Sequence, residues 1–346
     1  MFDRYRFKSD HMNHGMEVLL TGSSGYIGTR LADRFSEQGV TVHGVDRDSY
    51  EGDSLSSVVT GDLLDTATLD RANLDVDCIC HLAAAKGDWG ISEEEYYRDN
   101  LEATRTVIEA GVEAGVKDWV FYSTVSTLGP HHESVGEDAY FNPINPYGAS
   151  KVEAEKLFHQ LADDDPEVRV LIIRPSVVYG PGNPPSTNIY RLVDAIYNGR
   201  FAMVGSGEAI KSTSYIENLL EATLFLMERM DQGVQTYIYV DEPALTTAVL
   251  VERIYGLLGR TPPSWHIPLS VASSIAAVSD VAADLTGIDF PITAARIEKF
   301  NRSTNFDASK IREEGFEQPV SNEDALRKTV EWHLHHEYGE PLPGDA

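Results

Sequence analysis

Three side chains of this 346-residue chain have the types and spacing of a site that interconverts alcohols and ketones. Tyr147 and Lys151 lie four residues apart in "YGASK", so on a helix they are neighbours on one face. A nearby ammonium stabilises a phenolate, and such a tyrosine can act as a general acid or base. Ser123 and Thr124 follow the apolar run "DWVFY", which predicts hydroxyls at the end of a strand. A tyrosine and a lysine at this spacing also occur on solvated helices, and such hydroxyls also cap loops. These residues therefore indicate catalysis only if the chain has a cofactor site as well.

A glycine-rich stretch is the candidate cofactor site. "TGSSGYIG" follows the apolar run "MEVLL" and spaces Gly22, Gly25 and Gly28 as G-x-x-G-x-x-G. Between a strand and a helix, such glycines allow a tight turn and bring backbone amides close to a pyrophosphate. A strand–helix turn that binds nothing would have the same pattern.

Asp46 favours a dinucleotide. It ends the next apolar run, "TVHGVD", 18 residues after Gly28. A carboxylate there accepts hydrogen bonds from ribose hydroxyls and repels a 2′-phosphate, which predicts NAD rather than NADP. The adjacent Arg47 would favour NADP if it paired with that phosphate. Asp62, after a third predicted strand, is a candidate acceptor for the adenine amino group, or alternatively a helix N-cap.

The elements that would position these residues alternate along the chain. Predicted strands cover 17–22, 40–46, 78–84, 118–124, 168–176 and 236–242, and predicted helices cover 27–38, 96–114, 146–162, 189–198 and 217–230. This order predicts an α/β fold, a Rossmann-type doubly wound parallel sheet with a smaller discontinuous α/β substrate-capping domain. The predicted boundaries are a tail at 1–16, a dinucleotide-binding domain at 17–178 plus 214–242, and a substrate-binding domain at 179–213 plus 243–340.

Composition narrows the range of partners and compartments. The chain has 55 acidic and 28 basic residues and a formal net charge of −27, a field that repels nucleic acid and anionic membranes. With no apolar segment long enough to span a bilayer and no signal peptide, we expect a cytoplasmic protein. The scarcity of lysine (9 against 19 arginines) favours a host with a high-salt cytoplasm, and an ordinary acidic cytosolic enzyme is the alternative.

Cysteine and histidine do not indicate a metal site. Cys78 and Cys80 are expected to be free thiols with side chains on opposite faces of a strand. His333, His335 and His336 do not share one helix face and have no carboxylate at ligand spacing, so we expect surface histidines.

In this order, the glycine turn, Asp46, "HLAA", "YSTVS" and "YGASK" resemble the extended short-chain dehydrogenase/reductase family. Within it, the chain is similar to the NAD-dependent nucleotide-sugar epimerases and dehydratases, such as UDP-galactose 4-epimerase, from Glu17 to about His336. The resemblance implies NAD as cofactor, a nucleotide-sugar substrate, and a homodimer that pairs helices 96–114 and 146–162.

The resemblance also implies roles for individual residues. Tyr147 is the acid/base, Lys151 binds the nicotinamide ribose and lowers the tyrosine pKa, and Thr124 replaces the usual catalytic serine. The candidate cofactor-binding residues implied by the resemblance, together with Arg47 beside Asp46, are Gly22, Gly25, Tyr26, Ile27, Gly28, Asp46, Arg47, Asp62, Leu63, Ala83, Ala84, Lys86, Asn100, Tyr147 and Lys151.

Candidate substrate residues follow from the same resemblance. Asn188 matches a contact of the sugar-nucleotide diphosphate, and Ala202 lies in a segment that resembles the uracil-binding backbone. Lys211 stands where relatives carry an arginine, so it keeps a cation but loses the bidentate fork. Arg296 belongs to a segment similar to that of enzymes acting on N-acetylated UDP-sugars. The full set is Ser123, Thr124, Asn188, Ala202, Lys211 and Arg296.

The predicted function is a 4-epimerase of a UDP-hexose or UDP-N-acetylhexosamine that works through a 4-keto intermediate. Val125 and Ser126 follow Thr124 where 4,6-dehydratases have Asp-Glu, which disfavours a dehydratase. A 4-keto-sugar reductase would use the same residues and stays open. A dehydrogenase of another small or steroid-like alcohol, and a cofactor-binding protein without turnover, are further alternatives.

Overall fold

A seven-stranded sheet organises the computed structural model, which describes residues 15–87, 90–274 and 294–343. The strands are β1 (Glu17–Thr21), β2 (Thr41–Asp46), β3 (Ser57–Thr60), β4 (Cys78–His81), β5 (Asp118–Tyr122), β6 (Arg169–Pro175) and β10 (Gly233–Tyr239). They are parallel, in the order β10-β6-β5-β4-β1-β2-β3. The chain order reverses between β1 and β4, and doubly wound sheets bind ligands at the carboxyl ends of such strands. The predicted Rossmann-type sheet is confirmed.

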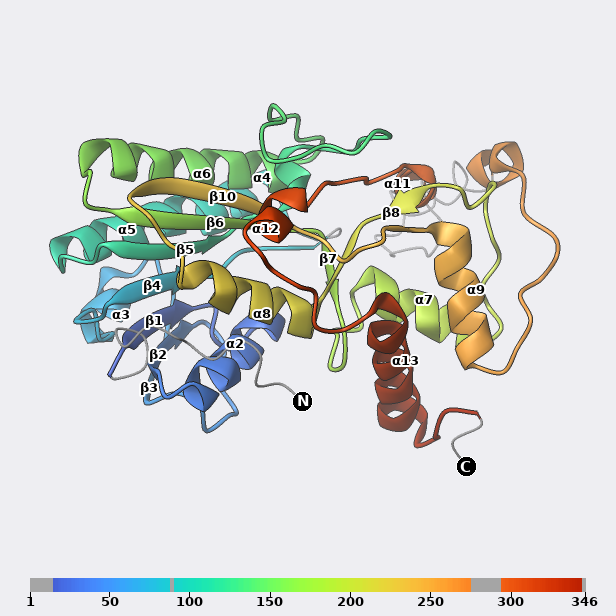
Figure 1. Cartoon of the computed structure of the whole chain (residues 1–346), viewed down its shortest axis with the longest axis horizontal. Coiled ribbons are helices and arrows are strands. Elements are labelled where there is room, and N and C mark those ends of the chain that lie inside the picture. The colour runs from blue at the N-terminus through green and yellow to red at the C-terminus, as the bar shows by residue number, and fades with distance from the viewer. Residues whose placement is uncertain (1–14, 88–89, 275–293, 344–346) are drawn as a thin grey trace.

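Helices cover both faces of this sheet (Figure 1). They are α2 (Tyr26–Glu37) and α8 (Ile216–Met227) on one face, and α3 (Thr66–Arg71), α4 (Glu93–Tyr97), the π-helical turn η1 (Arg98–Glu102), α5 (Ala103–Glu113) and α6 (Pro146–Asp164) on the other. Strand side chains alternate between the two cores: Val18 and Leu20 pack with α2 and α8, whereas Leu19 packs with α5 and α6. Burial on both faces explains why the central strands β1, β4 and β5 are largely apolar.

The two cysteines of β4 correct one expectation. Both are free and buried, and both lie in the core that contains α2, whereas Ile79 between them lies in the other core. The prediction of opposite faces was wrong, because residues two apart on a strand share a face.

The second part of the chain gathers beside the sheet, at the right of Figure 1. Its elements are β7 (Val177–Tyr179), α7 (Asn188–Tyr197), β8 (Ile210–Lys211), β9 (Thr213–Tyr215), β11 (Leu245–Thr246), α9 (Thr247–Leu257), α11 (Ala294–Asn301) and α13 (Asn322–Tyr338). The short helix α12 (Ser309–Glu313) packs on β10 of the sheet instead. Parallel pairing of β7 with β9 and antiparallel pairing of β8 with β11 mark where the chain leaves the sheet and returns. The domain boundaries given above stay a prediction.

No helix of the described residues is long and apolar enough to cross a membrane.

Candidate active site

The glycine turn joins β1 to α2 at the carboxyl edge of the sheet. Gly22 has a φ of 73°, and a Cβ there would lie 2.7 Å from the backbone N of Ala83. A Cβ on Gly28 would lie 2.0 Å from the carbonyl O of Gly22. Both positions therefore require glycine for close backbone packing. Gly25 is the N-cap of α2 and provides no side-chain cap, so first-turn amides such as that of Ile27 can serve as donors to a pyrophosphate.

Asp46 ends β2 beside this turn. Its Oδ2 accepts a hydrogen bond from the amide N of Ser24 (2.9 Å), and its Oδ1 accepts one from the amide N of Asp48 (3.0 Å). The carboxylate is thus fixed at the loop where a dinucleotide-binding sheet holds the ribose.

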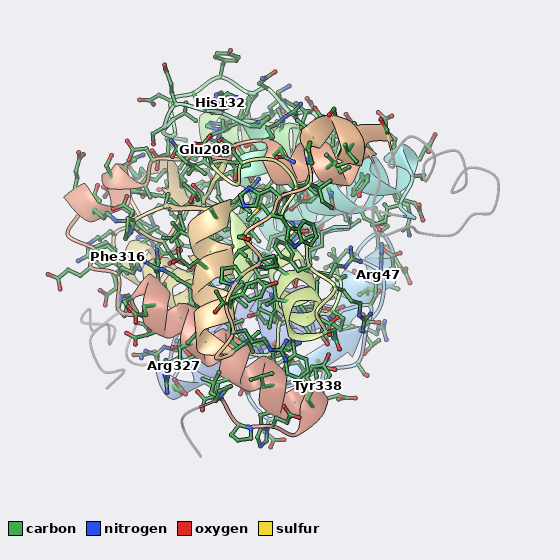
Figure 2. All side chains as sticks on the ribbon, turned by 90° about the vertical axis from the view of Figure 1, so that its right-hand side faces the viewer. Arg47, His132, Glu208, Phe316, Arg327 and Tyr338 are labelled. Atoms are coloured by element: carbon green, nitrogen blue, oxygen red, sulfur yellow. The ribbon has the colours of Figure 1, made fainter. Side chains whose placement is uncertain are left out.

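Arg47 is bound by neighbouring acids. Its Nη1 and Nη2 donate to the two carboxylate oxygens of Asp99 (2.7 and 2.6 Å), and Nη2 also donates to Asp62 Oδ1 (3.2 Å). The hydrogen bond with Asp99 is the main reason why the pKa of Arg47 is raised. Arg47 lies on the flank of the molecule, away from the loop that carries His132 (Figure 2). Its guanidinium is therefore engaged within the protein rather than left for a 2′-phosphate.

Asp62 follows β3 and is not a helix N-cap. The cap of α3 is Asp65, whose Oδ1 accepts from the amide N of Ala67 (3.1 Å). Asp62 Oδ1 accepts from the amide N of Leu64 (3.0 Å). Burial raises the pKa of Asp62, but hydrogen bonds from Leu64, Arg47 and Arg98 outweigh it and lower that pKa. The next residue, Leu63, is buried in the core.

Asn100 ties the loop after β4 to α6. It is fully buried in η1, and its Oδ1 accepts from the amide N of Ala85 (2.7 Å). Its Nδ2 donates to the carbonyl O of Ala85 (3.1 Å) and to Ser150 Oγ (3.0 Å). The π-helical turn interrupts the helix predicted over 96–114, and such turns are frequent at functional sites. In the clamped loop, Ala83 and Ala84 are half-buried and Lys86 is exposed.

The start of α6 fixes the position of Tyr147. Asn145 is the N-cap, its Oδ1 accepts from the amide N of Gly148 (2.7 Å), and Pro146 follows at the first helical position. A Cβ on Gly148 would lie 2.4 Å from the carbonyl O of Ser126. Glycine therefore lets the first turn of α6 approach the 3₁₀ turn η2 (Val125–Thr127), which begins directly after Thr124.

Thr124 and Tyr147 interact across this contact. Thr124 Oγ1 accepts from the amide N of Ser126 (3.1 Å), which leaves the hydroxyl hydrogen free to be donated. The pKa of Tyr147 is raised to about 12, mainly by burial. A hydrogen bond with Thr124 opposes this rise, and Tyr96 adds to it. The ring of Tyr96 lies 6.0 Å from that of Tyr147. The structure thus brings two of the predicted catalytic hydroxyls together.

Lys151 follows one turn later on α6 and is 1% exposed. Its Nζ lies 3.9 Å from the centroid of the Phe121 ring. Burial lowers the pKa of Lys151 to about 7, against the carboxylate of Glu155, which raises it. Ser123 differs from its neighbour Thr124, because its hydroxyl donates to Glu155.

The candidate substrate residues are less closely organised. Asn188 is exposed at the start of α7, and Ala202 is half-buried in the segment after that helix. Lys211 lies in β8, and its Nζ donates to the carbonyl O of Arg302 (2.6 Å). Arg296 belongs to α11, but its side chain lies outside the described residues.

The C-terminal histidines depart in part from expectation. His333 is 1% exposed, and its ring lies 4.5 Å from that of Tyr190, so it is not a surface residue. It is buried because α13 packs against α7 and α9 in the second part of the chain. Within the described ranges, no three His, Cys, Asp or Glu side chains are grouped to hold a metal ion.

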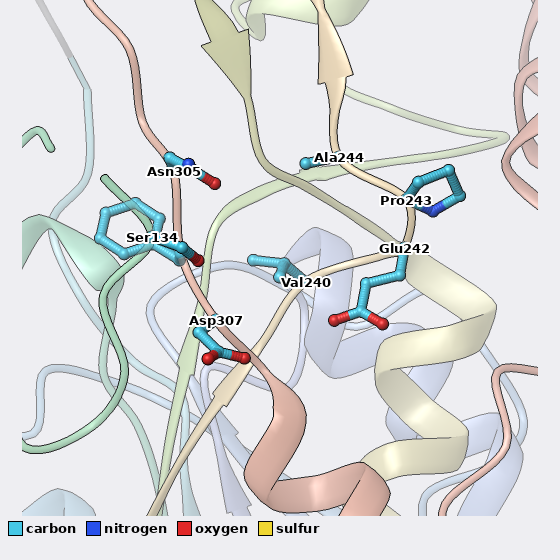
Figure 3. Close-up of a pocket in the computed structure, with 8 residues that line it drawn as sticks. Ser134, Val240, Glu242, Pro243, Ala244, Asn305 and Asp307 are labelled. Atoms are coloured by element: carbon cyan, nitrogen blue, oxygen red, sulfur yellow. The ribbon is translucent and has the colours of Figure 1, made fainter. Parts of the chain in front are cut away.

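A hollow of about 510 Å³ lies apart from these residues, beyond the end of β10 (Figure 3). Its lining consists of Ser134, Val240, Glu242, Pro243, Ala244, Asn305, Phe306 and Asp307. Glu242 pairs with Arg312 (2.9 Å), and Asp307 Oδ1 accepts from the amide N of Ser309 (2.7 Å). Both carboxylates are thus engaged, and the hollow contains none of the predicted site residues.

Comparison with known proteins decides the family. Residues 18–240 match the profile of the NAD dependent epimerase/dehydratase family, more than half of the chain. The chain belongs to this family. The epimerase/dehydratase family uses NAD, and the requirement for glycine at Gly22 and Gly28 and the fixed carboxylate of Asp46 fit that cofactor.

Individual relatives of this family member differ in substrate. One is the N-acetyl-alpha-D-glucosaminyl-diphospho-ditrans,octacis-undecaprenol 4-epimerase of Escherichia coli O157:H7, 32% identical over 321 residues, which cover 92% of this chain and 96% of that protein. Another is the decarboxylating sterol-4-alpha-carboxylate 3-dehydrogenase of Mus musculus, 26% identical over 343 residues, 95% of this chain and 93% of that protein. The solved structure of MoeE5 in complex with UDP-glucose and NAD is 26% identical, covers 93% of this chain and 99% of its own, and has a TM-score of 0.72.

Proposed function

We propose that this protein is a cytoplasmic, NAD-dependent 4-epimerase of a UDP-hexose or UDP-N-acetylhexosamine. One observation carries the proposal: Thr124, Tyr147 and Lys151 are assembled at the carboxyl edge of the sheet that also presents the glycine turn and Asp46. The similarity to a 4-epimerase over nearly the whole chain supports the choice of reaction.

The residues at the sheet edge suit reversible oxidation of the C4 hydroxyl. Bound NAD would supply the acceptor, and then the donor, of the hydride at C4, with the glycine turn, Asp46 and Asn100 holding it. Tyr147 takes the proton of the C4 hydroxyl, and the hydroxyl of Thr124, which accepts from the amide of Ser126, would donate to that oxygen and orient it. Because burial holds the pKa of Tyr147 at about 12, proton removal at neutral pH needs a positive charge nearby. Lys151, one turn away, supplies it.

After the 4-keto sugar has rotated in the site, hydride would return to its other face, and Tyr147 gives the proton back to the C4 oxygen. The same side chains would serve a 4-keto-sugar reductase, which stops after one reduction. The absence of an Asp-Glu pair after Thr124 disfavours a dehydratase, since Val125 and Ser126 occupy those positions.

A second candidate substrate is the same sugar on a lipid diphosphate. Its support is the relative of Escherichia coli O157:H7, whose name specifies a diphospho-undecaprenol carrier. Lys211 is compatible with either carrier, because a lysine can neutralise a diphosphate without reading a nucleotide base.

The experiment is an epimerisation assay with purified protein, NAD and a panel of matched substrates: UDP-glucose, UDP-N-acetylglucosamine and N-acetylglucosaminyl-diphospho-polyprenol. Appearance of the C4 epimer without net NADH supports the proposal, and the substrate that reacts identifies the carrier. Net NADH with no epimer would point to a dehydrogenase. No reaction with any of the three would overturn the proposal.

We also propose a homodimer that pairs α5 and α6 of two copies. Val112 lies on α5, one of the two helices of the proposed interface, and is 50% exposed, so it is available for an apolar contact. Light scattering coupled to size exclusion tests this, and a V112E variant should shift the mass toward the monomer.

A further inference from the structure

Glu155 is a fully buried carboxylate for which the proposed chemistry has no use. It lies on α6 one turn beyond Lys151, so the two side chains are neighbours on the helix face that carries Tyr147. Burying a carboxylate is costly unless it is paired and hydrogen-bonded. A fully buried glutamate at this position therefore calls for a compensating partner and a purpose.

Arg174 and Ser123 provide that compensation. Arg174 Nε donates to Glu155 Oε1 (3.0 Å) and Nη2 donates to Oε2 (2.6 Å), and the hydroxyl of Ser123 donates to Oε1. Arg174 is itself only 4% exposed. Three donors on two oxygens compensate the burial of this carboxylate.

The cluster connects the elements that carry the catalytic residues. Ser123 stands directly before Thr124 at the end of β5, Arg174 lies in β6, and Glu155 lies in α6. Arg174 Nη1 also donates to the carbonyl O of Glu137 (3.2 Å), in the loop that leads into α6. A change at Glu155 would therefore reach both sides of the Thr124–Tyr147 contact.

The charges around Lys151 single out Glu155. On α6 itself, Glu155 is one turn after Lys151 and Tyr147 one turn before. From β4, His81 faces Lys151. Burial, and to a smaller extent the charge of Lys151, lowers the pKa of His81 to about 3, so its ring is neutral. The ring nitrogens of His81 lie at hydrogen-bond distance from Thr21 Oγ1 (2.6 Å) and Thr104 Oγ1 (2.9 Å). From β5, Phe121 offers only its ring face.

We propose that Glu155 is a positioning residue: held by Arg174 and Ser123, it keeps the buried Lys151 charged and fixes α6 against the strand end that bears Thr124. It does not touch the reacting atoms. The inference rests on the proposed role of Lys151 in supporting Tyr147, but the charge of Lys151 can be measured without substrate. An ion pair that did not act on Lys151 would leave that charge unchanged.

The test is an NMR titration of the Lys151 side chain in the cofactor-free full chain, assigned by the loss of its signal in Lys151→Met. Glu155→Gln keeps the shape but removes the negative charge, so the midpoint should fall by about one pH unit or more. Arg174→Met leaves Glu155 without its cation, so the midpoint should move the other way. Glu153→Gln is the matched control, because the side chain of Glu153 is 41% exposed and pairs with Lys156, and it should leave the midpoint in place.

Opposite shifts in the two variants support the proposal, because general loosening of the fold would move both in the same direction. Where one variant does not fold, the sign of the shift in the other decides. An unchanged midpoint in a folded Glu155→Gln or Arg174→Met protein would overturn the proposal. With a reacting substrate, Glu155→Gln should also lower kcat more than it changes KM and move the high-pH limb of kcat to lower pH. Failure of every substrate would refute the proposed function but leave the titration result standing.

Discussion

The sheet side and the second part of the chain contribute to the proposed active site in different ways. On the sheet side, side chains are held by the backbone: Asp46 by two amides, Asn100 by both polar groups of Ala85, and Thr124 by the amide of Ser126. On the other side, Asn188 is exposed, and the half-buried Lys211 donates to the carbonyl O of Arg302. In the proposed reaction, the sheet edge with its backbone-held side chains would carry the chemistry, and the second part of the chain would select the substrate. Relatives that share the fold but act on a lipid-linked sugar or a sterol agree with this division.

The largest effect should come from the sheet side. Tyr147→Phe removes the hydroxyl that exchanges the proton, and we expect turnover to fall by about 10²- to 10⁴-fold with little change in substrate affinity. Initial rates and substrate binding measured on the same preparation check this. Turnover within a few-fold of the unmodified protein would show that Tyr147 is not the acid/base.

A change on the substrate side should separate affinity from chemistry. Lys211→Met removes a cation expected to face the diphosphate, so KM should rise by roughly 10-fold, as for an exposed or half-buried charged contact, while kcat changes little. Lys211→Arg, which keeps the charge, is the control and should stay near the original KM. An equal fall of kcat in Lys211→Met would mean that the two sides are not separable.

The burial of Lys151 also predicts how the stability of the folded protein depends on pH. The pKa of Lys151 is about 7 in the folded protein but lies at its ordinary value, above 10, in the unfolded chain. Between these values the unfolded state binds more protons, so this group makes stability rise with pH from about 7 to about 10. Lys151→Met should therefore be more stable than the unmodified protein at pH 6, with the gap narrowing by pH 9.

Urea unfolding at pH 6, 7.5 and 9 measures that gap. Lys211→Met serves as the comparison for the loss of a lysine that is half-buried rather than fully buried. A gap that is constant across the three pH values would contradict the account of Lys151.

The smallest effect concerns the choice between NAD and NADP. Asp99→Asn weakens the hold on Arg47 and frees its guanidinium for a 2′-phosphate, so affinity for NADP should rise several-fold relative to NAD. Calorimetric titration with both dinucleotides checks the ratio. Glu102→Gln, on the same turn but paired with Arg105, should leave it unchanged. If Asp99→Asn also leaves the ratio unchanged, Arg47 does not control this choice.

The features that the sequence predicted correctly are those encoded in short stretches of the chain. The alternation of strands and helices, the glycine turn and the Tyr147–Lys151 pair each follow from local patterns in the sequence. The structure confirms the parallel sheet and places the turn and the pair at its carboxyl edge. Their assignment to NAD and substrate remains the proposal made above.

What the sequence missed depends on contacts between distant segments. Glu155 and Arg174 read as ordinary charged residues, and only the packing of α6 on β6 makes them a buried pair. The capture of Arg47 by Asp99 joins residues 52 positions apart, which no spacing rule foresees. Ser123 and Thr124 were both predicted to face the substrate, but the hydroxyl of Ser123 donates to the carboxylate of Glu155, which the sequence did not indicate.

The central claim is that a hydrogen leaves C4 of the sugar and returns to the same carbon on its other face. The most direct measurement is conversion of the reactive substrate of the panel with deuterium at C4, with the label in the epimer followed by NMR. The account predicts that the product epimer keeps deuterium at C4 and that no labelled NADH accumulates. An epimer that has lost the label to solvent, or labelled NADH without epimer, would contradict it.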